Sequence, residues 1–536
     1  MRCRTEPWPG RVVAPWTSLP AGIRPGRGGG RWRKEARLPK IPPRLHGKLR
    51  ARAHYSRFAH HYFQNIAPLF FAPEVAGGPL LIATAVAILA MNSPWAEAYA
   101  AFWQTPLALS FGGAELRYSL AEWANEALLP IFFFGIGVEV KRELTKGLLS
   151  ERATAAFPFF GAVGGLLVPV LIYLAFNLGG EGQGGWGIPV TMDTAFALGI
   201  LGFAGHSMPR ILRVLLMAFS AVDDVGGLLV IAFAYTPDVQ FWPLLGALLA
   251  YGAVLGLIRT GVISSVPYVL LGLVVWFLMQ QAHVHATLAG VALGFLVPTV
   301  PRVSSGSFAH KVRHPLRLFR RARRQMESDS QERKQEGHED AARALGTLSE
   351  LSDATYEAAE RVLAIANPWI TFVVLPLFAL SNAGIAISPD LLRDAVASPV
   401  ALGIVAGLLL GKPVGFLGAT WLACRAGLAR LPEATSWGMI AALGILAGIG
   451  FTVSLFISHL AFGGTRHEEL ARIAVLASSV VAGLLGYVTL RWALASGKDT
   501  GAGENPDRAE EPGRAKAPRR RRVRGAGTQQ NEHTPG

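Results

Sequence analysis

The chain has 536 residues, of which 51% are hydrophobic and only 16% are charged. This composition points to a membrane protein with several spans. The net charge of +15 is concentrated in the two ends of the chain, so it is weak evidence for nucleic-acid binding and fits basic tails near anionic headgroups. Because Cys3 and Cys424 are the only cysteines, no disulfide framework or metal site is implied.

Residues 1–58 are rich in Gly, Pro and Arg and lack the continuous apolar segment of a secretory signal, so we expect a basic disordered extension. Beyond them, apolar segments recur at lengths suited to roughly 30 Å of hydrocarbon. Twelve are predicted, near residues 76–95, 121–140, 154–178, 187–205, 211–235, 241–258, 263–281, 284–299, 363–385, 398–421, 436–462 and 469–493. The sequence therefore predicts an all-α polytopic membrane protein.

These segments form two groups, eight within residues 59–299 and four within residues 361–493. Between them lies a hydrophilic insert, residues 300–360, which we predict to be a flexible cytoplasmic loop. A second basic disordered tail is expected over residues 494–536. The distribution of Lys and Arg among the short loops places both termini in the cytoplasm.

Asp223 and Asp224 are adjacent within one of the apolar segments. An acidic side chain in the bilayer core costs roughly 2.5 to 3.5 kcal/mol, so intramembrane acids normally handle ions or protons. Neighbouring helical residues project about 100° apart, and the two carboxylates therefore cannot point in one direction. We expect one to face a cation site while the other contacts a proton or Lys412, a lysine of the tenth segment.

Two segments have sequences that weaken a helix. The fourth contains Pro189 and places Asp193 between the hydroxyls of Thr191 and Thr194, whereas the eleventh is interrupted by glycines around residues 444–450. Interrupted helices are tolerated at membrane depth where they line a cavity. Glycines alone equally allow close helix packing, and Asp193 is what favours a site.

Lys412 can be interpreted in two ways. A lysine near a helix end can extend to the membrane interface, but an unpaired buried ammonium is costly and three acids are available, so we expect pairing with one of them. Carboxylates that bind either a proton or a hard cation such as Na⁺ or Li⁺, but not both, give exchange without ATP. The sequence contains no Walker-type phosphate-binding loop that would contradict this.

These residues lie in segments that together resemble the signature sequences of NhaA-type sodium/proton antiporters. The segments, in the family's order, are Gly137–Leu144, Asp193–Gly199, Val222–Asp224, Val284–Gly290, Gly411–Pro413 and Gly448–Thr452. The resemblance extends over residues 65–493 apart from the insert. It implies about 12 transmembrane helices with inverted repeats, in which the fourth and eleventh helices are interrupted and cross.

The resemblance also implies electrogenic, pH-regulated export of Na⁺ or Li⁺ in exchange for protons, in a bacterial inner membrane. It makes Asp224 the carboxylate that binds Na⁺ or a proton. Asp223 would be its partner in sodium binding and proton exchange and would pair with Lys412. Asp193 would be a balancing charge at the helix break. Because Met192 stands where the family usually has Thr, the hydroxyl ligand stays open between Thr191 and Thr194.

The family's pH response is associated with the cytoplasmic mouth, which the resemblance maps to Glu139, Arg142, Glu143 and His285. A helix end rich in Glu and Arg is more often a solvated terminus, and a lone histidine is usually structural, although histidine can titrate near neutral pH. Both interpretations stay open. Glu126 is carried over only as a candidate pathway residue.

Two other classes also use buried acids. An intramembrane aspartyl protease needs two aspartates that converge from separate helices, which adjacent residues fit poorly, and a cation channel lines its pore with acids but gains nothing from a buried lysine. We therefore expect a transporter and not an enzyme. It would need no cofactor, its partners would be membrane lipid, Na⁺, Li⁺ and protons and not nucleic acid, and a homodimer is left open.

Overall fold

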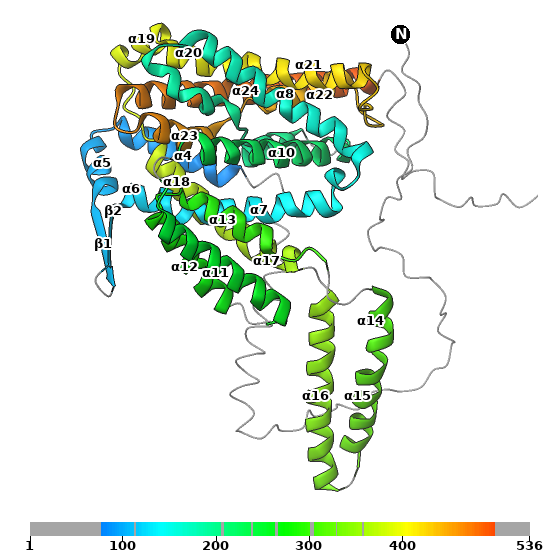
Figure 1. The fold of residues 1–536 in the computed structure, drawn as a ribbon. Coiled ribbons are helices and arrows are strands. Elements are labelled where there is room, and N and C mark those ends of the chain that lie inside the picture. Colours follow the sequence, from blue (N-terminus) through cyan, green and yellow to red (C-terminus); the bar gives the residue numbers. More distant parts are fainter. Residues whose placement is uncertain are drawn as a thin grey trace, which may run out of the picture. The chain divides into compact units, whose positions relative to one another are not determined.

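The computed structural model describes residues 77–498, apart from 112–113, 205–207, 237–238, 263–265, 301–304, 329 and 356–357. The predicted extension over residues 1–58 and nearly all of the predicted tail over residues 494–536 lie outside the described residues. The described chain is almost entirely helical (Figure 1).

The elements before the insert include η2, a π-helix, and η3 and η4, which are 3₁₀-helices. In chain order they are α4 (Gly78–Met91), α5 (Ala96–Gln104), β1 (Pro106–Phe111), β2 (Ala114–Ser119), α6 (Leu120–Trp123), η2 (Ala124–Leu128), α7 (Leu129–Lys146), η3 (Leu148–Ser150), α8 (Arg152–Asn177), η4 (Glu181–Val190), α9 (Thr194–Phe203), α10 (Arg210–Ala234), α11 (Phe241–Thr260), α12 (Val266–Gln281) and α13 (Ala286–Leu296).

The insert and the elements after it include two further π-helices, η5 and η6. In chain order they are α14 (Ser305–Lys311), α15 (Arg313–Met326), α16 (Gln331–Thr355), α17 (Ala358–Trp369), η5 (Ile370–Val374), α18 (Leu375–Asn382), α19 (Pro389–Ala397), α20 (Pro399–Ala406), η6 (Gly407–Gly411), α21 (Lys412–Arg425), α22 (Trp437–Leu446), α23 (Phe451–Phe462) and α24 (Arg466–Lys498).

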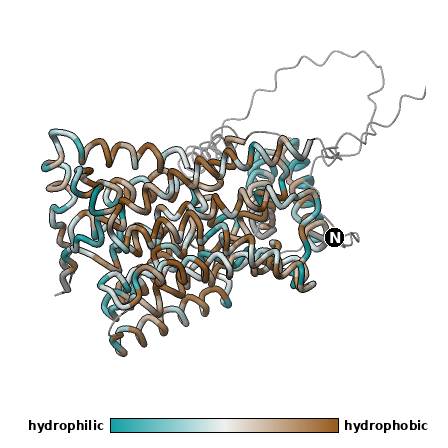
Figure 2. Tube along the Cα trace, turned by 90° about the horizontal axis from the view of Figure 1, so that it is seen from above, coloured by the Kyte–Doolittle hydropathy of each residue, from teal (hydrophilic) through white to brown (hydrophobic). Residues whose placement is uncertain are grey.

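Among the described residues, seven continuous helices are long and apolar enough to cross a membrane. Three helix pairs pass the same test together but are bent at a short break: α4 with α5 by 116°, η4 with α9 by 46°, and α22 with α23 by 42°. The helices α12 and α13 are apolar but shorter. Figure 2 shows the apolar stretches, in brown, running along the packed helices. The chain is therefore a polytopic helical membrane protein.

The seventh and eighth predicted segments are separate helices in the structure. The helix α12 ends at Gln281, and α13 begins at Ala286. Between them His283 has a φ of 57°, in the left-handed region that a continuing helix does not use.

The prediction that the insert is a flexible loop was wrong, because most of it is helical. Its helices α15 and α16 pack against each other, and Gly337 of α16 lies so close to α15 that an added Cβ would be 2.7 Å from the carbonyl oxygen of Ala322. The reason lies in the composition of α16, which is rich in Ala, Leu and Glu. These residues favour a helix wherever apolar side chains can be covered.

The all-α prediction also omitted a small antiparallel hairpin of β1 and β2. Pro106 pairs with Ser119 and Phe111 with Ala114, so the two intervening residues are Gly112 and Gly113. A Gly-Gly pair between alternating apolar residues is a typical signal for such a hairpin.

Small residues allow the helices that carry the site to approach closely. Figure 1 shows α8 beside α21, and an added Cβ on Gly415 of α21 would lie 2.7 Å from the carbonyl carbon of Gly164 in α8. Close approach through small residues is a common way to pack helices in membranes, where apolar burial alone gives little driving force. This packing positions Lys412, at the start of α21, against α8 and α10.

Candidate functional site

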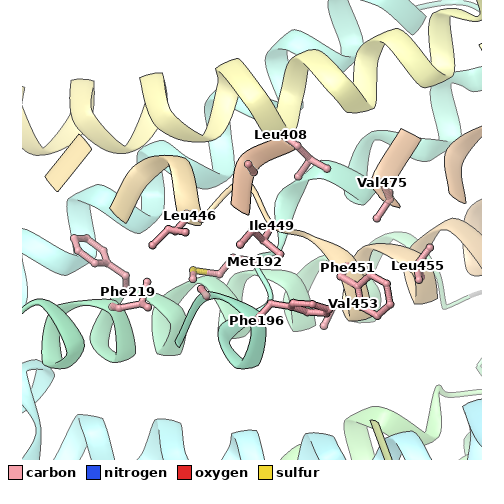
Figure 3. Close-up of a cluster of buried hydrophobic side chains, with 14 of the residues drawn as sticks. Met192, Phe196, Phe219, Leu408, Leu446, Ile449, Phe451, Val453, Leu455 and Val475 are labelled. Atoms are coloured by element: carbon pink, nitrogen blue, oxygen red, sulfur yellow. The ribbon is translucent and has the colours of Figure 1, made fainter. Parts of the chain in front are cut away.

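The two helix breaks contact each other directly. The backbone N–H of Asp193, between η4 and α9, donates to the carbonyl oxygen of Ile449 at 2.5 Å, and the Ser454 hydroxyl of α23 donates to the carbonyl oxygen of Ile188 at 2.7 Å. Figure 3 shows the apolar residues around this contact, where the rings of Phe196 and Phe451 lie 4.9 Å apart. Polar groups at each break thus find hydrogen-bond partners at the other: the Asp193 N–H at Ile449, and the Ser454 hydroxyl at Ile188.

The Asp193 carboxylate caps two helices at once. Its Oδ1 accepts from the backbone N–H of Phe196 in the first turn of α9, and its Oδ2 accepts from that of Thr452 in the first turn of α23, both at 3.1 Å. Helix N-termini carry partial positive charge and unpaired N–H groups, so a carboxylate between two of them is stabilised. Asp193 therefore has partners for both oxygens and is 3% exposed.

Asp223 is paired with Lys412. The ammonium Nζ donates to Asp223 Oδ1 at 2.6 Å, and the two side chains are 1% and 4% exposed for the lysine and aspartate, respectively. The other oxygen, Oδ2, accepts from the backbone N–H of Met192 at 2.7 Å. The structure thus places the lysine beside one specific acid of the three, and that acid also contacts the broken segment before α9.

Asp224 faces a separate small cavity. The Ser220 hydroxyl, one turn earlier on α10, donates to Asp224 Oδ2 at 3.1 Å, and Ser220 also contacts the hydroxyl of Thr194. The cavity has a volume of about 10 Å³, close to what one water molecule requires. Its lining comes from α7, α9 and α10 and consists of Ile136, Glu139, Val140, Thr194, Met217, Ser220, Ala221 and Asp224.

This cavity presents only oxygen atoms as polar side-chain groups: two carboxylates, from Asp224 and Glu139, and two hydroxyls, from Thr194 and Ser220. Oxygen ligands suit hard cations, and a carboxylate at such a site can carry a proton instead. Asp223 does not line this cavity. Of the two aspartates predicted to bind sodium together, Asp223 is in the ion pair with Lys412 and Asp224 alone lines the cavity.

The structure distinguishes the two candidate hydroxyls. Thr194 lines the cavity, whereas the Thr191 hydroxyl is buried without a hydrogen-bond partner among the described residues and does not line it. Ser220 was missed by the sequence analysis. Its signal was its spacing of four residues before Asp224, which puts both side chains on one face of a helix.

The predicted pH-response residues are not all together. Glu139 lines the cavity, and Arg142 and Glu143 follow within one turn of α7. His285, grouped with them in the prediction, lies elsewhere, at the start of α13. Its Nε2 is 2.6 Å from the carbonyl oxygen of Tyr235, which follows α10.

That grouping was wrong because of how α13 packs against α7. Gly290, near the start of α13, lies against Pro130 at the start of α7, and the Lys141 ammonium near the end of α7 donates to the carbonyl oxygen of Val297 at 2.8 Å. The two helices therefore run in the same direction. His285 consequently sits at the end of α7 opposite to Arg142 and Glu143.

Glu126 also lies at that opposite end, within η2. Its Oε2 accepts from the Gln280 side chain at 2.6 Å, and its backbone carbonyl accepts from the Trp276 ring N–H at 2.6 Å. Both partners belong to α12. Glu126 thus connects η2 to α12 and does not line the cavity beside Asp224.

Comparison with known proteins agrees with these observations. A family described as "Na+/H+ antiporter 1" matches residues 69–490. An Na(+)/H(+) antiporter NhaA 2 of Sorangium cellulosum is 38% identical over 441 residues, which is 82% of this chain and 92% of that protein. An NhaA antiporter of Rhodopirellula baltica is 39% identical over 433 residues, 81% of this chain and 95% of that protein. The chain belongs to the NhaA family of sodium/proton antiporters.

Proposed function

We propose that this protein exchanges sodium for protons across a bacterial inner membrane and that Asp224 is the group that binds the two ions alternately. Lithium would be accepted as a second hard monovalent cation. The protein moves ions down and up their gradients without converting a substrate chemically and without a resident cofactor.

One observation carries this proposal: the two adjacent aspartates have different environments. Lys412 and a backbone N–H already occupy both oxygens of Asp223, whereas Asp224 has a hydroxyl donor and an open cavity. A buried carboxylate without a compensating positive charge is unfavourable. At Asp224 either a proton or a sodium ion supplies that compensation, and binding of one excludes the other.

The Asp223–Lys412 pair is a second proton-handling group in this proposal. Asp223 accepts a hydrogen bond from the backbone N–H of Met192, the residue before the cap residue Asp193. A change of charge in the pair would therefore alter a hydrogen bond at the break before α9. Exchange would be electrogenic if the pair and Asp224 together take up more positive charge as protons than sodium carries out.

The proposed topology follows from the apolar helices. Counting each bent pair and each of the two short helices as one crossing gives twelve, with both termini in the cytoplasm. The interrupted fourth and eleventh crossings would be η4 with α9 and α22 with α23, within inverted repeats. A pH response is proposed for Glu139, Arg142 and Glu143, because they continue from the cavity along α7.

The test is exchange in everted membrane vesicles loaded with a pH-sensitive dye. Asp224→Asn should abolish the dequenching that sodium or lithium produces in the wild-type vesicles. Asp390→Asn, which neutralises an exposed acid of α19, is the matched control and should leave the dequenching unchanged. Exchange by Asp224→Asn at the wild-type rate, with equal protein in the membrane, would refute the assignment.

A further inference from the structure

The helix α15 of the insert is strongly basic. It contains six arginines and no acidic residue between Arg313 and Met326. Four of the arginines, at positions 313, 317, 320 and 324, are spaced by four, three and four residues. That spacing places them in one stripe along a single face of the helix.

The opposite face of α15 packs against α16. Pro315 and Ala322 are buried, and Phe319 and Met326 are half-buried, at the same four, three and four spacing. Since the two sets lie on opposite sides of the helix, the arginine stripe faces away from α16. The stripe is therefore an outer face of the hairpin that α15 and α16 form.

The charge of the stripe is not neutralised within the hairpin. Among the described residues, the ion pair that α15 makes is between Arg323, outside the stripe, and Glu327. Two of the acids of α16, Glu339 and Asp340, pair with Arg343 of the same helix. The four stripe arginines have no ion-pair partner in the part of the chain that the structure describes.

We propose that the arginine stripe of α15 binds the anionic phospholipid headgroups of the membrane in which the protein is embedded. The hairpin is held near that membrane at both ends, because apolar α13 ends at Leu296 and a spanning helix begins with α17 at Ala358. Guanidinium groups form paired hydrogen bonds with phosphate oxygens, and the stripe extends over roughly 16 Å of helix. With the proposed topology, which this inference adopts, the surface is the inner leaflet.

The charge complementarity favours a membrane over other acidic partners. A basic cluster beside a transmembrane helix is a common device for binding acidic lipids, and each Arg near such a surface strengthens the association by about fivefold. The hairpin need not diffuse to its partner, since its two connections keep it at the surface.

The experiment uses the full chain with Cys3 and Cys424 replaced by Ser and a fluorophore on Leu318→Cys, an exposed position of α15. The protein is placed in nanodiscs of phosphatidylcholine, with or without phosphatidylglycerol, that carry a headgroup spin-label quencher. We expect strong quenching only with phosphatidylglycerol, and its loss at about 1 M salt, where screening acts over about 3 Å. The readout does not involve transport, so it stands or fails separately from the exchange proposal.

Replacing the four stripe arginines by Gln should weaken the lipid-bound state by roughly 100-fold or more. The matched control replaces four other cations of the hairpin, Arg323, Arg333, Lys334 and Arg343, by Gln, and should keep the quenching despite an equal change in net charge. A variant with Lys at the four stripe positions should retain lipid binding, which separates loss of charge from loss of folding.

Three results would overturn the proposal. The first is equal quenching in both kinds of nanodisc. The second is equal loss in the stripe variant and the control variant. The third is saturable binding of RNA by the labelled helix with no response to phosphatidylglycerol, which would assign the stripe to nucleic acid.

Discussion

The three acids of the site differ in what compensates their charge. Asp193 caps two helices, Asp223 pairs with Lys412, and Asp224 faces a cavity. That the neighbours Asp223 and Asp224 face different ways was predictable, because it follows from helix geometry. The position of Glu139 at the same cavity could not be predicted in this way, since it depends on how α7 packs against α10.

Lys412→Met should destabilise the protein by about 3 to 5 kcal/mol, because it leaves the Asp223 carboxylate buried without its partner. The double variant Asp223→Asn with Lys412→Met should recover most of this loss, since no uncompensated charge remains. Thermal unfolding of the purified protein in detergent checks both. A single variant as stable as wild type, or a double variant no better than the single, would contradict the pairing.

Glu139→Gln should raise the sodium concentration needed for half-maximal exchange by about tenfold or more, because it removes one of the two negative charges beside the cation, and two unit charges about 4 Å apart interact by about 4 kcal/mol at an effective dielectric constant of about 20. The measurement is the sodium dependence of dequenching in everted vesicles. Glu151→Gln, at an exposed acid before α8, is the control and should behave as wild type. An unchanged sodium dependence for Glu139→Gln would exclude its carboxylate from the site.

At the scale of elements, the fourth and eleventh segments each consist of two helices with a short break between them. The sequence placed one near Pro189 to Asp193 and another at glycines 444–450, and the structure has non-helical residues between η4 and α9 and between α22 and α23. The insert hairpin was missed because mixed charge resembled a loop, although its helix-forming residues were present. The π-helices η2, η5 and η6 have no recognised sequence signal here.

Close packing of α8 and α21 can be tested with two glycines of one helix. Gly415→Ala should cost about 1 to 3 kcal/mol, because its Cβ would overlap the backbone carbonyl group of Gly164 in α8. Gly418→Ala is the control, since an added Cβ there meets nothing within 4 Å, and it should be neutral or stabilising by up to about 1 kcal/mol. Equal melting temperatures for the two variants would show that this interface is not tightly packed.

At the scale of the whole molecule, the prediction of a polytopic helical membrane protein is confirmed by the apolar helices of the described residues, whereas the count of twelve crossings stays a prediction. Hydropathy predicts such segments well because a lipid environment requires continuous apolar helices. It does not predict which helices become neighbours. The contact between α13 and α7 therefore could not be obtained from the sequence. Their common direction could, because the second and eighth of twelve alternating segments cross the membrane the same way, which already places His285 opposite to Arg142 and Glu143.

The central claim is that sodium and protons compete for Asp224. Isothermal titration calorimetry of sodium binding to the purified protein, repeated across pH and in buffers of different ionisation enthalpy, tests it most directly. We predict that sodium affinity falls as the pH falls and that protons are released to the buffer on binding, with both effects lost in Asp224→Asn. Sodium affinity that stays constant across pH, without proton release, would contradict the account.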